Sequence, residues 1–111
     1  MTITPKKPVK ILIVNDSQVL TAVIRATVET HANYKVVATA LNGIEAISQV
    51  KRHLPDLVLM DIHMPKMNGV EATHQIIRNC PKTRILITSA TITRNMRHIF
   101  EALHHGATDY V

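Results

Sequence analysis

The chain has 111 residues, enough for one domain that buries roughly 65% of its unfolded surface. Apolar residues make up 46% and charged residues 19%, which excludes a disordered chain, and no apolar run approaches the ~18 residues of a membrane span. The net charge of +5 comes from scattered basic residues with only two Tyr and one Phe beside them, so we expect no nucleic-acid binding by this domain.

The predicted elements begin after residues 1–8, where Pro5 and Pro8 favour a flexible N-terminal arm ahead of a domain over 9–111. Short β-branched segments predict strands at 9–14, 35–40, 57–60, 84–88 and 107–111. Apolar residues at helical spacing predict helices around 20–28, 44–54, 70–77 and 96–103. The Asn-Gly pairs at 42–43 and 68–69 are expected to lie in the turns between these elements.

The first residues carry no apolar core of the kind found in a secretory signal. The single cysteine, Cys80, can form no internal disulfide bond. A reducing cytoplasm is therefore the expected location.

The strict alternation of strands and helices predicts parallel strands, right-handed crossovers and helices on both faces of the sheet. We therefore expect an α/β flavodoxin-like, doubly wound fold with a five-stranded sheet in the order 2-1-3-4-5. Ligands of such sheets bind at the carboxyl ends of the strands, where the strand order reverses. The residues that leave the first, third and fourth strands there are Asn15, Asp16, Ser17, Asp61, Thr88 and Ser89.

Asp16 and Asp61 are expected to lie close together, because neighbouring strands are about 4.8 Å apart. Two such carboxylates repel each other unless a proton or a cation lies between them. Mg²⁺ takes few protein oxygens and leaves positions for phosphate oxygens, so the pair predicts a magnesium and phosphate site. In one alternative, Asp16 only caps the helix that begins near Gln18. In another, His63 joins both carboxylates in a transition-metal site.

Four segments resemble the receiver domain of two-component response regulators, namely ILIVNDS, DLVLMDIHMPKMNGVEA, ILITSA and GATDYV. The resemblance extends from Lys10 to Val111. Its most specific part is the central block, in which an apolar strand, Asp61, two residues, Met-Pro and Gly69 follow one another. The resemblance implies phosphorelay signal transduction, in which a sensor histidine kinase transfers a phosphoryl group to Asp61.

The same resemblance implies a Mg²⁺ cofactor and roles for further residues. The acidic pair that binds the metal in this family matches Asn15 and Asp16, so Asn15 is expected to bind weakly or through a water. The family's metal-binding backbone carbonyl matches His63, and its phosphate-sensing hydroxyl matches Ser89. The output face, formed by the fourth helix and the last strand, matches Arg94, Arg97 and Tyr110.

A family lysine and the final helix would lie beyond Val111, so we expect a receiver truncated at its C-terminus, without the catalytic lysine. The apolar surface uncovered by the missing helix would favour a homodimer.

A narrower resemblance links VVATALNGIEAI, MNGVEAT and FEALHHGATDYV to the N-terminal receiver of chemotaxis-type protein-glutamate methylesterases. It implies an output domain in the parent chain. No G-x-S-x-G motif is present, so these residues are expected to have no enzyme activity of their own. Phosphatases of the haloacid dehalogenase type require an acid where this chain has His63. The remaining alternatives are a phosphorylation-independent interaction domain and the receiver of a DNA-binding transcription regulator.

Overall fold

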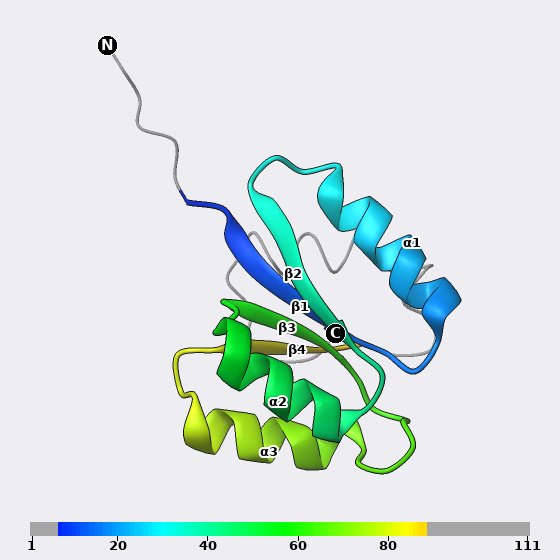
Figure 1. Ribbon diagram of the computed structural model, residues 1–111, viewed down its shortest axis with the longest axis vertical. Coiled ribbons are helices and arrows are strands. Elements are labelled where there is room, and N and C mark those ends of the chain that lie inside the picture. The colour runs from blue at the N-terminus through cyan, green and yellow to red at the C-terminus, as the bar shows by residue number, and fades with distance from the viewer. Residues whose placement is uncertain (1–6, 89–111) are drawn as a thin grey trace.

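The computed structural model describes residues 7–88, which form a four-stranded parallel sheet with helices on both faces (Figure 1). The elements are β1 (Val9–Val14), α1 (Gln18–Glu29), β2 (Tyr34–Ala40), α2 (Gly43–His53), β3 (Leu57–Asp61), α3 (Gly69–Asn79) and β4 (Arg84–Thr88). The strand order β2-β1-β3-β4 confirms the predicted flavodoxin-like arrangement over this part of the chain. The predicted helix around 96–103 and the strand at 107–111 lie outside the described residues.

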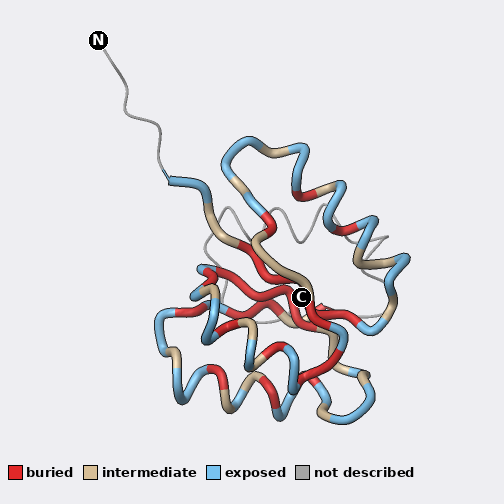
Figure 2. The backbone as a smooth tube through the Cα atoms, viewed as in Figure 1, coloured by how far each residue is buried: buried red, intermediate tan, exposed pale blue. Residues whose placement is uncertain are grey.

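The two central strands are buried on both faces, which explains their uninterrupted apolar sequences. On one face, Ile11 and Ile13 of β1 belong to a cluster that also contains Ile24 of α1. On the other face, Leu12 and Val14 belong to a cluster formed with α2 and α3. Figure 2 shows the buried backbone concentrated in these strands. The buried sheet therefore supports the loops at the carboxyl ends and at the amino ends of its strands.

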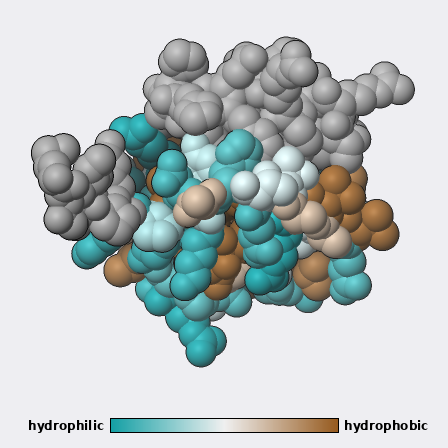
Figure 3. Space-filling model, turned by 90° about the horizontal axis from the view of Figure 1, so that it is seen from above, coloured by the Kyte–Doolittle hydropathy of each residue, from teal (hydrophilic) through white to brown (hydrophobic). Residues whose placement is uncertain are grey.

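Some apolar side chains remain at the surface of the described part. Val19 is 75% exposed and Leu54 is 61% exposed. On the face drawn in Figure 3, hydrophobic patches interrupt a mainly hydrophilic surface. None of the helices within residues 7–88 combines the length and the apolar character needed to cross a membrane.

The helices α2 and α3 begin with nearly the same sequence, Asn-Gly-Ile-Glu-Ala and Asn-Gly-Val-Glu-Ala. The side chain of Asn42 accepts the N–H of Glu45 at 2.9 Å, and that of Asn68 accepts the N–H of Glu71 at 3.0 Å. In α2 the glutamate also accepts a side-chain N–H of Asn42 at 3.2 Å, so these two residues form a reciprocal cap. Each asparagine therefore lies in the loop, as predicted, whereas each glycine is the first residue of the helix rather than part of the loop.

The helix α1 begins at Gln18, as predicted, but Ser17 is its N-cap. The hydroxyl of Ser17 accepts the N–H of Leu20 at 3.1 Å. The alternative in which Asp16 serves only as the cap is therefore wrong, because the neighbouring serine takes that position. The carboxylate of Asp16 is left at an exposed position beside the carboxyl end of β1.

Candidate functional site

The carboxyl ends of β1 and β3 lie side by side, because Val14 is paired with Met60 in the parallel register. Asn15 directly follows Val14, and Asp61 directly follows Met60, so both residues lie at the same edge of the sheet. Asp61 is half-buried at the end of β3, and Asp16 is exposed. The negative charge of Asp16 acts on the carboxyl group of Asp61, as expected for two aspartates that follow neighbouring parallel strands.

Burial raises the pKa of the Asp61 carboxyl, and the negative charge of Asp16 raises it further. The backbone N–H groups of Ile62 and His63 lower this pKa, as does the charge on the His63 ring, but the net shift is upward. The surroundings therefore disfavour the ionised form of Asp61. A cation between the two carboxylates would remove this disadvantage.

Asn15 holds the loop that presents Asp16. Its side chain is almost fully buried, and its Oδ1 accepts the N–H of Ser17 at 2.8 Å. Its own N–H donates to the carbonyl of Ala40 in β2 at 3.0 Å. A metal ion at Oδ1 would compete with the bond from Ser17, which is consistent with weak or water-mediated binding by Asn15.

The loop after Asp61 is attached to the start of α3 at Gly69. The N–H of Gly69 donates to the carbonyl of Ile62 at 2.9 Å. A Cβ at this position would overlap the carbonyl oxygen of Asp61 and lie 2.9 Å from its carbonyl carbon. Glycine is therefore required by the close approach of α3 to the backbone at Asp61.

A second glycine attaches the same loop to the start of α2. The N–H of Gly43 donates to the carbonyl of Met67 at 2.9 Å. A Cβ on Gly43 would lie 2.7 Å from that carbonyl oxygen and 2.8 Å from the Met67 Cγ. This contact was not predicted from the sequence, because it joins two segments that lie far apart along the chain.

Thr88 also supports the site in a way that the sequence did not reveal. It ends β4 and is paired with Asp61 across the sheet. Its buried hydroxyl donates to the carbonyl of Met60 at 3.2 Å, which fixes the end of β3 directly before Asp61. The other predicted site residues lie outside the described part of the chain, so their roles stay predictions, namely Ser89, Arg94, Arg97 and Tyr110.

The oxygen donors at this edge fit Mg²⁺. Asp16 and Asp61 each bring a carboxylate to this end of the sheet, and carboxylate oxygens are ligands that Mg²⁺ prefers. Within residues 7–88, no three side chains of His, Cys, Asp or Glu come together as a metal cluster. In this part of the chain, the exposed His63 therefore does not form a three-residue group with both aspartates, as the transition-metal alternative had expected.

Comparison with known proteins identifies the family. Residues 11–111 match the response regulator receiver domain. The protein-glutamate methylesterase/protein-glutamine glutaminase of group 3 operon from Pseudomonas putida is 42% identical over 102 residues, covering 92% of this chain and 30% of that protein. Protein-glutamate methylesterase/protein-glutamine glutaminase 5 from Geobacter metallireducens is 34% identical over 106 residues, covering 96% and 29%. The chain thus spans less than a third of these relatives.

Solved structures show the same relationship. The response regulator domain of Thermotoga maritima CheB is 31% identical, with a TM-score of 0.76 over 95% of this chain and 78% of that chain. The CheX-CheY-BeF3-Mg²⁺ complex from Borrelia burgdorferi contains a chain that is 30% identical, with a TM-score of 0.71 over 95% and 78%. The chain belongs to the response regulator receiver domains and resembles those of the CheB methylesterases.

Proposed function

We propose that Asp61 accepts a phosphoryl group from a phosphohistidine of a sensor kinase. Mg²⁺ would be held by Asp16, Asp61 and the backbone carbonyl of His63, with Asn15 bound weakly or through a water. The observation that supports this proposal is a half-buried carboxylate at a strand end whose pKa is raised by burial and by a second carboxylate. A similar chain was solved in a complex that contains BeF3 and Mg²⁺, which adds support for a metal ion and a small anion as ligands.

The reaction requires positioning more than a strong base. An Asp61 oxygen attacks phosphorus in line with the P–N bond; the new P–O bond forms, and the P–N electron pair returns to the imidazole nitrogen, which then takes up a proton. Bound Mg²⁺ supplies charge neutralisation for the phosphoryl oxygens. The chain contributes a fixed carboxylate, because Thr88 and Gly69 hold the backbone on either side of it.

The resemblance to receiver domains also implies how the chain would respond to phosphorylation of Asp61. Ser89 would donate a hydrogen bond to the phosphoryl group, and the output face would contain Arg94, Arg97 and Tyr110. Phosphorylation adds about −1.5 to −2 charge at the sheet edge, which is the signal that this face would transmit.

We infer that residues 9–111 act as the receiver of a longer cytoplasmic chemotaxis methylesterase, with residues 1–8 as an arm and the output domain in the same parent chain. This inference rests on the methylesterase relatives, of which the chain covers about 29–30%. Reading the gene downstream of Val111 tests it. A hydrolase domain is expected, and a helix-turn-helix domain would instead indicate a transcription regulator.

Incubation with acetyl phosphate and Mg²⁺, followed by mass spectrometry, tests the phosphoacceptor proposal. The chain should gain one phosphoryl group, and both chelation of Mg²⁺ and Asp61→Asn should prevent this. Asp56→Asn is the matched control, because an amide oxygen there can still accept the N–H of Lys10. Labelling that survives Asp61→Asn would contradict the proposal.

A second candidate is a phosphorylation-independent interaction domain. It is favoured by Asn15, which stands where the family has an acid and whose Oδ1 already accepts the N–H of Ser17. A folded chain that acquires no phosphoryl group at saturating Mg²⁺ would support this candidate.

A further inference from the structure

The edge of the sheet opposite Asp61, here called the basal edge, collects positive charge. It comprises the amino ends of the parallel strands and the carboxyl ends of α2 and α3. Its basic residues are Lys7, Lys10, Lys35, Lys51, Arg52, Lys82 and Arg84. Lys10 and Lys35 are partners in the register of β1 and β2, and the ammonium group of Lys10 donates to the carbonyl of His53 at the end of α2 at 3.0 Å.

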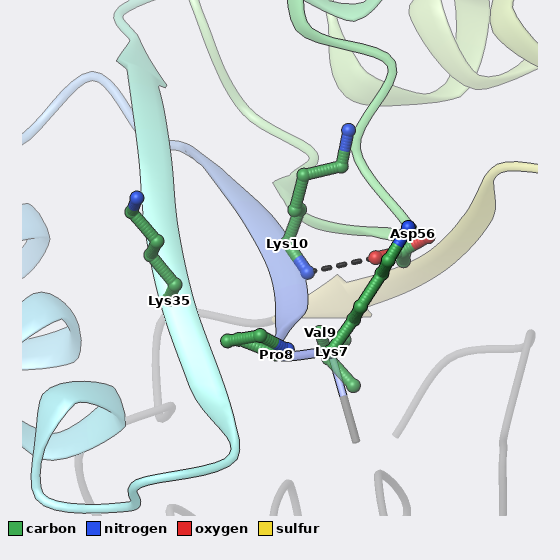
Figure 4. A pocket seen from close by; sticks show the side chains of 6 residues that line it. All are labelled: Lys7, Pro8, Val9, Lys10, Lys35 and Asp56. Atoms are coloured by element: carbon green, nitrogen blue, oxygen red, sulfur yellow. Dashed lines mark hydrogen bonds between the residues drawn. The ribbon is translucent and has the colours of Figure 1, made fainter. Parts of the chain in front are cut away.

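The acids near this edge in the described structure, Asp56 and Glu29, are outnumbered by the basic residues, and each accepts a hydrogen bond. An oxygen of Asp56 accepts the backbone N–H of Lys10 at 2.8 Å, as Figure 4 shows. Glu29, at the end of α1, accepts the Nε of Arg25 at 3.0 Å. Lys7, Lys35 and Lys82 are exposed, so this edge offers positive charge to a partner.

Two adjoining pockets open at the basal edge and share Asp56. One is lined by Lys7, Pro8, Val9, Lys10 and Lys35 (Figure 4). Residues that line the other include Leu54, Pro55, Cys80, Pro81 and Lys82. Apolar surface predominates in both pockets, and each has at least one lysine at its wall.

Leu54 provides an independent observation. It ends α2 in the left-handed region, with φ 47° and ψ 58°. A Cβ disfavours this region, which is why glycine is common at the ends of helices. The side chain is also 61% exposed, so its packing compensates for little of the stability that the left-handed backbone conformation costs. Residues held in such sparsely populated backbone regions cluster at functional sites.

We propose that the basal edge binds an acidic polypeptide segment that carries apolar side chains. Leu54 contacts an apolar side chain of that segment, and Lys35 and Lys82 lie near its carboxylates. Apolar walls favour a polypeptide over a nucleic acid, and among the described residues that line the two pockets there is no aromatic side chain on which bases would stack. Apolar contacts with a charged rim are typical of protein interfaces. This site is separate from Asp61 and does not depend on its phosphorylation.

A titration of the ¹⁵N-labelled chain with a synthetic peptide of alternating Glu and Leu tests the proposal. Saturable NMR shifts are expected at Lys10, Lys35, Leu54 and Lys82. Leu54→Gly should weaken binding about tenfold, since burial of a leucine side chain contributes roughly that factor. The same variant should melt at a higher temperature, because glycine relieves the left-handed strain. Lys35→Glu should weaken binding by up to about fivefold.

Two control variants match these changes at the opposite edge. Lys66→Glu alters the net charge equally, and Val70→Ala shortens another exposed apolar side chain, so both should bind the peptide as the unaltered chain does. A peptide with Ser in place of Leu, and a DNA duplex, should give no saturable shifts. Equal binding of either probe, unchanged affinity of Leu54→Gly, or no shifts with the Glu-Leu peptide would each overturn the proposal. Labelling of Asp61 by acetyl phosphate should be unaffected by Leu54→Gly.

Discussion

Asp61 lies where its negative charge is disfavoured, and this has a consequence for stability. Its pKa is raised by burial and by Asp16, so the folded chain binds the proton more tightly than the unfolded chain does. The stability that this proton provides is fully present below the unfolded pKa, and it is lost as the pH rises through the folded pKa. At neutral pH without a metal ion, the ionised carboxylate should therefore destabilise the fold.

Asp61→Asn should accordingly raise the melting temperature at about pH 7 in the presence of a chelator. The gain should shrink as the pH falls to about 3, where the aspartate is itself neutral. Circular dichroism melting curves over this pH range provide the measurement. A gain that is independent of pH would show that charge is not the cause.

Gly69→Ala should destabilise the chain although alanine is the better helix former by about 1 kcal/mol. The added Cβ would overlap the backbone of Asp61, which no side-chain rotation can relieve. A net loss of roughly 1–3 kcal/mol is expected from such overpacking, together with slower labelling of Asp61. Urea unfolding measures the loss. Gly43→Ala is the comparison, because one of its clashes involves the flexible Met67 side chain and should cost less.

The sequence was sufficient to place Asp16 and Asp61 at the carboxyl ends of parallel strands, because the alternation of strands and helices predicts that arrangement. It was insufficient to identify the cap of α1, since Asn15, Asp16 and Ser17 are all favourable cap residues and backbone geometry selects among them. The contact of Gly43 with the loop after β3 joins segments far apart in the sequence. Local pattern carries no information about such a contact.

At the scale of elements, the apolar periodicities predicted the segments well. The strands β1 and β4 have the predicted bounds, and β3 extends to Asp61 because that residue pairs with Thr88 of β4. The helix starts were predicted one residue too late, after the glycine of each Asn-Gly pair, because asparagine and glycine favour both turns and helix starts. The distinction depended on the glutamate that follows two residues after each pair.

The two similar helix starts should differ in their contribution to stability. Asn42 is buried and bonds to Glu45 in both directions, whereas Asn68 makes an exposed bond to Glu71. Asn42→Ala should therefore cost up to about 2 kcal/mol and Asn68→Ala about 1 kcal/mol or less. Urea denaturation of both variants tests the order, and equal losses would show that the reciprocal cap of α2 adds nothing.

For the whole molecule, Mg²⁺ binding is expected to act as a stabilising ligand. A ligand at a hundredfold excess over its Kd stabilises the folded state by about 2.7 kcal/mol. The melting temperature should therefore rise with added MgCl₂, and Asp16→Asn should reduce the rise by removing a charged ligand. Asn15→Asp should make the rise begin at a lower Mg²⁺ concentration, because it adds a negative charge. The loop should be preserved in this variant, since a carboxylate can still accept the N–H of Ser17. Sodium chloride at matched ionic strength is the control. An identical rise in Asp16→Asn would place the metal elsewhere.

The irregular pairing of β2 bears on how two copies of the chain can associate. Among the described strands, β2 has β1 as its only neighbour, and their register shifts where Val36 faces Ile11 and Ala38 faces Leu12. Val37 is thus an extra residue that bends the strand and interrupts the row of hydrogen-bonding groups along its outer side. Continuation of one sheet into another across β2 is therefore disfavoured, so a homodimer would have to form through side-chain surfaces. The Val- and Thr-containing strand is correspondingly protected against the edge-to-edge stacking that leads to fibrils.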